Sequence, residues 1–190
     1  ISHQNAKKRM MEDVELYGGI YDFIKDFVQP KYDNESLPVF TYESKMTISQ
    51  GNEEIELYNF GKAHTDGDSV VVFKNNNVIH TGDAFVRYGY PYVDLNNGGS
   101  IKGLISFLGT LEQLCDDNTI IIPGHGGLSK KEDVTKLKNT LGDLYTKTVI
   151  GLKNGLSHNE ISDSIEETLN GDATVKLNYI KSIELELLRD

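Results

Sequence analysis

Residues 61–73, GKAHTDGDSVVVF, join a glycine-containing loop to an apolar run, and two later segments place an apolar run before such a loop. The later segments are residues 78–85, VIHTGDAF, and residues 120–127, IIIPGHGG. Each apolar run predicts a buried strand, and each loop carries one side chain that can bind a metal: His64, Asp83 or His125. Because functional loops gather at the ends of strands, we expect these three side chains to converge on one cavity.

The chemistry of these side chains favours a metal site without thiolates. Imidazole nitrogen and carboxylate oxygen are ligands that zinc accepts. Glycine allows the sharp turns that would aim the ligands inward, and it occurs at positions 67, 82, 124, 126 and 127. An isolated histidine beside a strand is more often structural than a ligand, so each motif is weak on its own. The ordered set is what is specific.

That ordered set, A-H-T-D-G-D-S, then T-G-D-A, then P-G-H-G, resembles the third, fourth and fifth conserved motifs of the metallo-β-lactamase superfamily. The resemblance extends over residues 40–150, and the opening ISHQNAKKRM is similar to the strand and helix that follow the family's first metal motif. It implies an α/β fold, the four-layered αββα sandwich. It further implies that His64 completes the first metal's histidine set, that Asp83 bridges two metals as the catalytic carboxylate, and that His125 binds the second metal.

The sequence departs from the family pattern in two places. The family's H-x-H-x-D-H motif is absent, and His3 is the only histidine before His64. We therefore expect residues 1–190 to form a single domain truncated at its N-terminal side, with half a metal site, weak zinc binding and no turnover alone. An N-terminal segment or a second copy of the chain would complete the fold. The second departure is Asp83, which stands where the best-known lactamases carry cysteine and is similar to glyoxalase II and lactonases.

The resemblance implies a metallo-hydrolase in the intact protein, with two zinc ions holding a hydroxide that attacks an ester, thioester, lactone or amide carbonyl of a small molecule. Three alternatives stay open: a β-lactamase proper, an iron-dependent enzyme similar to persulfide dioxygenases, and a catalytically incomplete fragment. The sequence contains no G-x-S-x-G motif, which argues against a serine nucleophile.

Further residues near the three motifs are candidates for supporting roles. His80 is a candidate partner that orients a ligand, although a packed strand histidine is equally consistent. Asp66 and Asp68 flank the His64 motif, where either could tune the site or cap the turn. Residues 85–99 follow Asp83 and are rich in tyrosine, a loop that borders the substrate pocket in the family. Its candidates for lining that pocket, with a packed aromatic loop as the simpler alternative, are Arg87, Tyr88, Tyr90 and Tyr92.

Composition excludes some functions. The net charge of −10 disfavours nucleic acid as a partner, because phosphate binding needs a basic surface. No apolar run approaches the ~20 residues of a membrane helix. The lone Cys115 excludes an internal disulfide and is expected to be a buried apolar side chain near a helix end. Because residue 1 is isoleucine, the sequence leaves the cellular compartment open.

The periodicity predicts the order of the elements. Helical segments are expected at 4–28 with a break at Gly18-Gly19, at 101–115, at 130–153 after a Ser129–Glu132 capping box, after a second capping box at Ser157–Glu160, and at 175–189. A surface loop is expected at 29–38. Strands are expected within 39–82, as two hairpins turning at Gly51-Asn52 and Asn75-Asn76, and at 118–122. This order indicates a sheet packed against helices.

Overall fold

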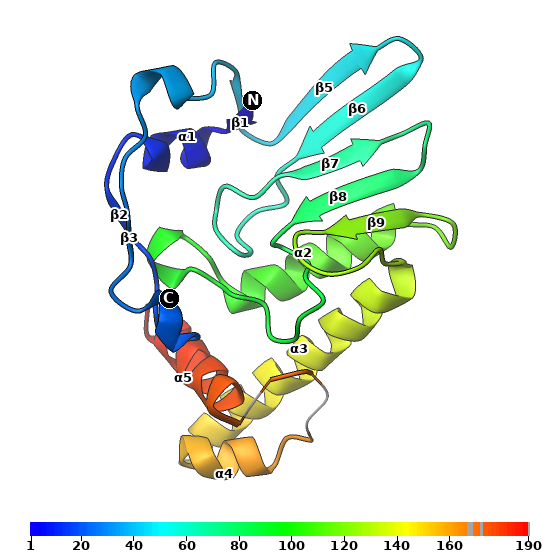
Figure 1. Cartoon of the computed structure of the whole chain (residues 1–190). Helices are drawn as coiled ribbons and strands as arrows, with labels where there is room; N and C mark the ends of the chain where they lie inside the picture. The colour runs from blue at the N-terminus through cyan, green and yellow to red at the C-terminus, as the bar shows by residue number, and fades with distance from the viewer. Residues whose placement is uncertain (167–168, 172, 190) are drawn as a thin grey trace.

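A five-stranded sheet forms the centre of the computed structural model, which describes residues 1–166, 169–171 and 173–189 (Figure 1). Its strands, in spatial and chain order, are β5 (Lys45–Gln50), β6 (Glu53–Tyr58), β7 (Val70–Phe73), β8 (Val78–Gly82) and β9 (Ile120–Pro123). The first four strands form an antiparallel meander, and β9 lies parallel to β8. Both predicted hairpins are confirmed, and their turns use the positive φ angles of Gly51 (61°) and Asn77 (51°).

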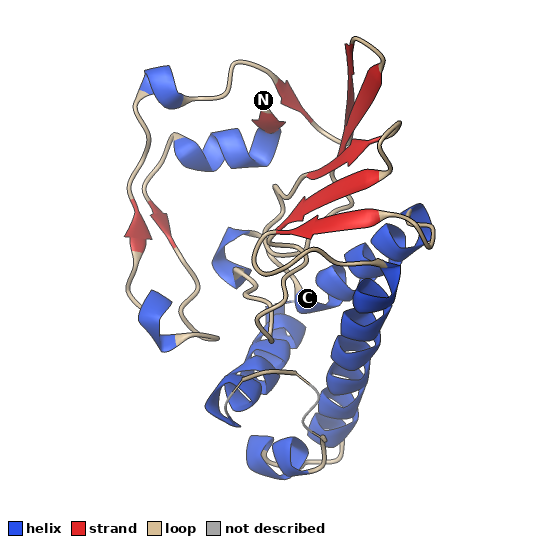
Figure 2. Cartoon of the chain, turned by 45° about the vertical axis from the view of Figure 1, so that its right-hand side comes forward, coloured by secondary structure: helices blue, strands red, loops and turns tan. Residues whose placement is uncertain are grey.

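Helices cover one face of this sheet (Figures 1 and 2). α2 (Ile101–Leu114) connects β8 to β9, and α3 (Lys131–Lys153) follows β9. α4 (His158–Asp163) and α5 (Ala173–Arg189) pack against each other and against α3. The predicted helices at 101–115 and 130–153, the capped short helix and the C-terminal helix are therefore confirmed. A parallel strand needs such a crossover connection, which explains why a helix separates β8 from β9.

The two faces of the sheet differ in burial. Val72, Ile79 and Ile121 lie in register on neighbouring strands and are at most 6% exposed in the core shared with α2 and α3. Alternation places the intervening side chains on the opposite face. That face is apolar but only partly buried, with Ile120 45% exposed; its other members are Met46, Ile48, Ile55, Leu57, Val71, Phe73, Val78 and Ile122. The described residues thus supply one sheet and one helical layer of the four layers expected.

The prediction of a helix over residues 4–28 is wrong beyond residue 10. The helix α1 (Gln4–Met10) buries none of its residues, so it lacks the tertiary packing that extends short helices. The chain continues as an arm, residues 11–40, with two short strands, β2 (Val14–Glu15) and β3 (Val28–Gln29), paired antiparallel. Two 3-10 turns, η1 (Asp22–Ile24) and η2 (Asn34–Ser36), complete the arm, and β1 (Ser2–His3) pairs with β4 (Thr41–Tyr42).

The capping box predicted from Ser129 and Glu132 is also wrong. Ser129 forms an antiparallel bridge with Ile121, which holds its backbone against β9. α3 therefore begins one residue later, and the carboxylate of Asp133 accepts a hydrogen bond from the backbone nitrogen of Lys130 at 3.0 Å. The pairing of Ser129 with β9 thus prevents Ser129 from capping α3, and the contact between Asp133 and Lys130 takes its place.

Two local features bear on stability. Lys45, Tyr58 and Lys74 surround the carboxylate of Glu56, and the hydrogen bonds from Lys45 and Tyr58 lower the pKa of Glu56 to about 2. Cys115 is buried at the end of α2, as predicted, and burial raises the pKa of its thiol to about 11.

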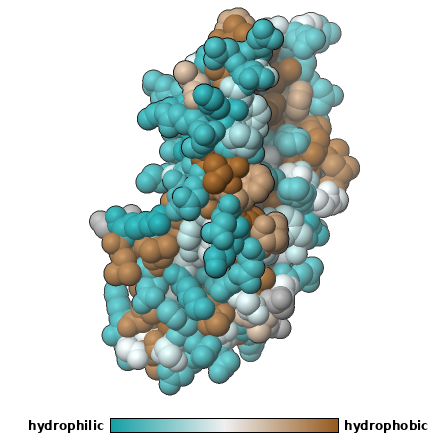
Figure 3. Space-filling view, turned by 60° about the vertical axis from the view of Figure 1, so that its left-hand side comes forward, coloured by the Kyte–Doolittle hydropathy of each residue, from teal (hydrophilic) through white to brown (hydrophobic). Residues whose placement is uncertain are grey.

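The surface mixes polar and apolar side chains. Figure 3 shows hydrophilic residues over most of one face, with apolar side chains between them. Among the described helices, none combines the length and the apolar character needed to cross a membrane.

Candidate metal centre

Asp83 and His125 meet where β8 and β9 end. The two strands are parallel and in register at Gly82 and Pro123, so the residues that follow them leave the sheet at the same edge. The Oδ1 atom of Asp83 lies 3.4 Å from the Nε2 atom of His125, and the side chains are 38% and 61% exposed. A carboxylate oxygen and an imidazole nitrogen this close and this open to solvent can share a cation between them.

Glycine at position 124 permits this approach. A Cβ atom at Gly124 would lie 2.0 Å from Oδ1 of Asp83, so any side chain there would displace the carboxylate. The backbone nitrogen of Gly124 donates to the carbonyl oxygen of Gly82 at 2.9 Å, which ties the two loops together. The P-G-H-G sequence is thus explained by close packing of its backbone against the end of β8.

His64 lies in the loop before β7 and is held by the tyrosine-rich loop. Its Nδ1 atom is 2.9 Å from the carbonyl oxygen of Tyr92, and its ring packs edge-on against the Tyr92 ring at 5.4 Å. The backbone nitrogen of Asp94 donates to the carbonyl oxygen of His64 at 2.8 Å. A carbonyl oxygen can only accept, so Nδ1 carries the proton and Nε2 has the lone pair for a ligand.

Tyr88 connects this loop to the Asp83–His125 pair. Its ring lies 5.6 Å from the His125 ring, and its hydroxyl oxygen accepts a hydrogen bond from the backbone nitrogen of Tyr92 at 3.3 Å. Burial raises the pKa of Tyr88, and the nearby charge of Asp83 raises it further. His64 and His125 therefore each contact the tyrosine-rich loop, His64 through Tyr92 and His125 through Tyr88.

The other three candidates for substrate contact differ in their surroundings. Arg87 forms an ion pair with Asp133 of α3. Tyr90 is 3% exposed and packs against Tyr179 inside the core, and Tyr92 is 9% exposed. Of the four residues predicted to line a pocket, Arg87 and Tyr88 are exposed and lie beside His125: the backbone nitrogen of Arg87 donates to the carbonyl oxygen of His125 at 3.0 Å, and the Tyr88 ring packs against the His125 ring.

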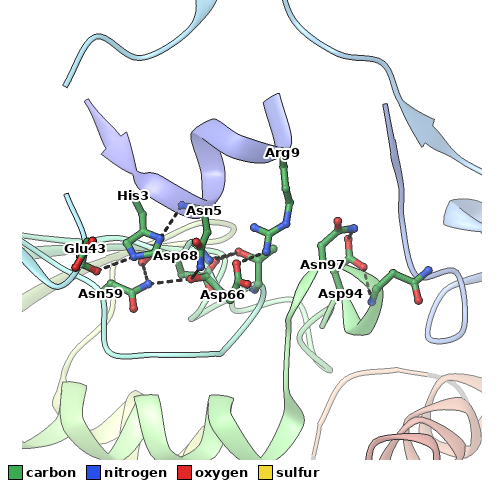
Figure 4. Close-up of polar contacts among 12 residues, drawn as sticks. His3, Asn5, Arg9, Glu43, Asn59, Asp66, Asp68, Asp94 and Asn97 are labelled. Carbon is green, nitrogen blue, oxygen red and sulfur yellow. Dashed lines mark hydrogen bonds and ion pairs between the residues drawn. The ribbon is translucent and has the colours of Figure 1, made fainter. Parts of the chain in front are cut away.

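Of the two aspartates near His64, it is Asp68 that caps the turn. Its carboxylate accepts hydrogen bonds from the backbone nitrogen and the hydroxyl of Thr65, both at 2.9 Å; burial raises the pKa of Asp68, against the opposing effect of His64. Asp66 forms an ion pair with Arg9 of α1 (Figure 4). The loop that carries His64 is therefore held by Asp68 within the loop and by Arg9 of α1.

His80 supports the backbone that carries Asp83. It is exposed on β8, and its Nδ1 atom accepts a hydrogen bond from the backbone nitrogen of Gly82 at 3.1 Å. The β8–β9 register shifts between His80 and Gly82, and this hydrogen bond satisfies the backbone N–H of Gly82 at that irregularity. The structure thus places His80 against the strand end, three residues before Asp83.

Sequence patterns did not reveal the contribution of the N-terminal arm. The hydroxyl of Tyr21 donates to the carbonyl oxygen of Tyr90 at 2.6 Å, and the backbone nitrogen of Tyr17 donates to Asp94 at 3.0 Å. These contacts join residues about seventy positions apart, as their numbering shows. The local signal for this segment is the run of glycines and tyrosines in YGGIY, and that run does not indicate which residues the segment contacts.

The candidate side chains are of the types that bind zinc, but they are too few for a complete site. Asp83 and His125 converge, and His64 has a fixed ring with a free nitrogen. Within residues 1–166, 169–171 and 173–189, however, no group of three or more His, Cys, Asp or Glu side chains is placed to hold a metal ion. A structural zinc site normally has four protein ligands and a catalytic one three, so these residues by themselves do not make a complete zinc site.

Three solved structures are similar to this chain. The stereoselective inverting sec-alkylsulfatase Pisa1 from Pseudomonas sp. matches with a TM-score of 0.60 and 13% identity over 80% of this chain and 27% of its own. A metallo-β-lactamase family protein from Thermus thermophilus matches with a TM-score of 0.58 and 17% identity over 88% and 53%. The BLEG-1 B3 metallo-β-lactamase matches with a TM-score of 0.53 and 16% identity over 70% and 59%.

The chain thus spans between 27% and 59% of the length of these three proteins. No protein-family model matches the sequence, and no curated protein does. The architecture of this chain is that of the metallo-β-lactamase fold.

Proposed function

We propose that this chain carries the Asp83–His125 part of the metal site of a metallo-hydrolase, and that His64 contributes a further ligand. The 3.4 Å approach of Asp83 Oδ1 to His125 Nε2 is the observation that supports it best. Two zinc ions are the metals proposed. Bound zinc supplies Lewis acidity and a nucleophile at neutral pH, suited to an ester, thioester, lactone or amide carbonyl.

The chain's own residues act by holding ligands in place. The Tyr92 carbonyl fixes the His64 ring, Gly124 lets the Asp83 carboxylate approach His125, and Tyr88 shields one side of the pair. Ligands in addition to these three are part of the proposal. A second copy of the chain or another polypeptide segment could supply them and could cover the apolar sheet face.

Zinc binding is the direct test. The 190-residue chain, stripped of metal, is titrated with zinc against a chromogenic chelator, beside Asp83→Asn and His125→Ala. His158→Ala is the matched control, because His158 also lies beside a carboxylate, Glu184, at 2.8 Å but far along the chain from the motifs. We expect weak binding that both site variants abolish and the control retains. Equal binding in Asp83→Asn and in the unaltered chain would contradict the proposal.

Turnover separates the hydrolase from its alternatives. We expect the 190-residue chain alone not to turn over a panel of thioester, lactone, carboxylic ester, alkyl sulfate and chromogenic β-lactam substrates. The product of the complete gene should hydrolyse one carbonyl class with zinc, and Asp83→Asn should remove that activity. The sulfate and β-lactam arms are included because two of the similar structures are an alkylsulfatase and a β-lactamase.

Two other results of these measurements would favour an alternative function. Bound iron with oxygen consumption would favour a redox enzyme of the same fold. A complete gene product that binds no metal would favour a catalytically incomplete protein, in keeping with the absence of a three-ligand group among the residues that the structure describes.

A further inference from the structure

A row of aromatic rings leads from the Asp83–His125 pair to the N-terminal arm. The Tyr88 ring lies 5.6 Å from the His125 ring, the Tyr21 ring 6.5 Å from that of Tyr88, and the Phe23 ring 5.5 Å from that of Tyr21. We call Tyr88, Tyr21 and Phe23 the aromatic strip. Its members come from two segments that the fold brings together.

The strip is held rigidly. Besides the Tyr21 hydrogen bond to the Tyr90 carbonyl, the hydroxyl of Tyr92 donates to the carbonyl oxygen of Tyr17 at 2.9 Å. Ile20, just before Tyr21, is fully buried in the core. These contacts fix the arm directly before η1, so the rings need little ordering when a ligand binds.

Phe23 is far more exposed than the apolar residues Ile20 and Ile24 near it. It is 82% exposed, while Ile20 is 0% exposed and Ile24 packs against the core. Tyr88 is 42% exposed at the other end of the strip. A single exposed apolar residue needs no explanation, but this one continues a row of rings that ends at the candidate metal ligands. Binding sites for small molecules are lined mainly by apolar and aromatic side chains with a few polar groups at one end.

We propose that the aromatic strip binds the apolar part of the substrate whose reacting carbonyl lies at Asp83 and His125. This inference rests on the proposed function and narrows its substrate class. The substrate is a carbonyl compound with an uncharged alkyl or aryl group long enough to reach from Tyr88 toward Phe23. The exposed residues that flank Phe23, Asp22, Lys25 and Asp26, carry charges of both signs, so the aromatic rings and not a charge select this end of the substrate.

A tryptophan reporter tests the strip without any metal. The chain contains no tryptophan, so Phe23→Trp introduces a single one at the free end of the strip. Val39→Trp is the matched control, because Val39 is also 82% exposed on the same arm but is not part of the strip. Both variants are titrated with ethyl, butyl and hexyl acetate in the presence of EDTA, and tryptophan emission is recorded.

We expect the Phe23→Trp emission to shift to shorter wavelength and to saturate. The half-saturating concentration should fall by up to about fourfold for each added methylene, the gain for burying that group. Adding Tyr88→Ala should weaken the response, and the control should show none. Equal responses in the two reporters, or no dependence on chain length, would overturn the inference. So would emission that is already shifted without ester and depends on protein concentration, because the strip would then be covered by a second copy.

The result is independent of the zinc titration. Since EDTA removes metal from the binding measurement, failure of the hydrolase proposal leaves the strip measurable, and failure of the strip leaves zinc binding intact. In the zinc-loaded product of the complete gene, Phe23→Ala should raise KM for hexyl acetate several-fold more than for ethyl acetate and leave kcat unchanged.

Discussion

Replacing Glu186 should destabilise the helical layer, because this α5 carboxylate caps the start of α2. It is 6% exposed and accepts hydrogen bonds from the hydroxyl of Ser100, from the backbone nitrogen of Ile101 at 2.9 Å and from that of Lys102 at 3.4 Å. A hydrogen bond to a charged group contributes ~1.5–3 kcal/mol, and a carboxylate at a helix N-terminus up to ~2 kcal/mol more. Because Glu186→Gln keeps one acceptor oxygen and loses the charge, we expect a loss of ~2 kcal/mol.

Urea unfolding followed by far-UV circular dichroism measures this loss. At a slope near ~3 kcal/mol per M, the midpoint should fall by about 0.7 M with the slope unchanged. Glu184→Gln on the same helix is the control, because the Glu184 side chain is 42% exposed and pairs with His158, so its loss should cost under ~0.5 kcal/mol. Equal midpoints for the two variants would refute the capping argument. Amide exchange should also quicken in residues 94–101, the loop that holds His64.

Three further changes test separate parts of the molecule. Gly124→Ala should abolish zinc binding by displacing Asp83, whereas Gly127→Ala, whose Cβ meets nothing within 4 Å, should retain it; equal zinc affinities would contradict the packing argument. Glu56 has a pKa of about 2 when folded against 4.5 as its ordinary value, so the hydrogen bonds from Lys45 and Tyr58 to its charged form should stabilise the protein above pH 4.5 and lose that effect as the pH falls toward 2. The free energy of urea unfolding of Glu56→Gln should accordingly depend less on pH over that interval than that of the unaltered chain, and an unchanged dependence would count against this assignment. Gly142→Ala in α3, where a Cβ meets nothing within 4 Å, should stabilise the protein by ~0.5–1 kcal/mol in thermal unfolding, and a lower unfolding temperature would contradict this expectation.

What covers the apolar face of the sheet can be tested by measuring self-association. Sedimentation of the 190-residue chain over a range of concentrations should show self-association if a second copy covers this face, and Phe73→Lys should then reduce it. A monomer at all concentrations would leave another polypeptide segment as the cover.

Local sequence determined the elements that contain their own signals. The hairpins turn at Gly51 and Asn77, and the helical stripe of α2 repeats every three or four residues, so period and turn chemistry were sufficient to predict them. The placement of Asp83 and His125 after two apolar runs was equally local. The sequence predicted that the two side chains would meet because each follows a strand, whereas the parallel pairing that brings them to one edge is a feature of the fold.

Tertiary structure alone decided what depends on contacts between distant residues. The arm after residue 10 has helical periodicity in its sequence, but hydrogen bonds to the tyrosine-rich loop hold it extended, and α1 has no buried face to prolong it. The tyrosines of the tyrosine-rich loop have different environments. Tyr90 packs against Tyr179 in the core, whereas Tyr88 packs against His125 at the surface. Neighbouring tyrosines are alike in sequence, and their environments differ because packing against α5 and the arm is set by residues that no local pattern identifies.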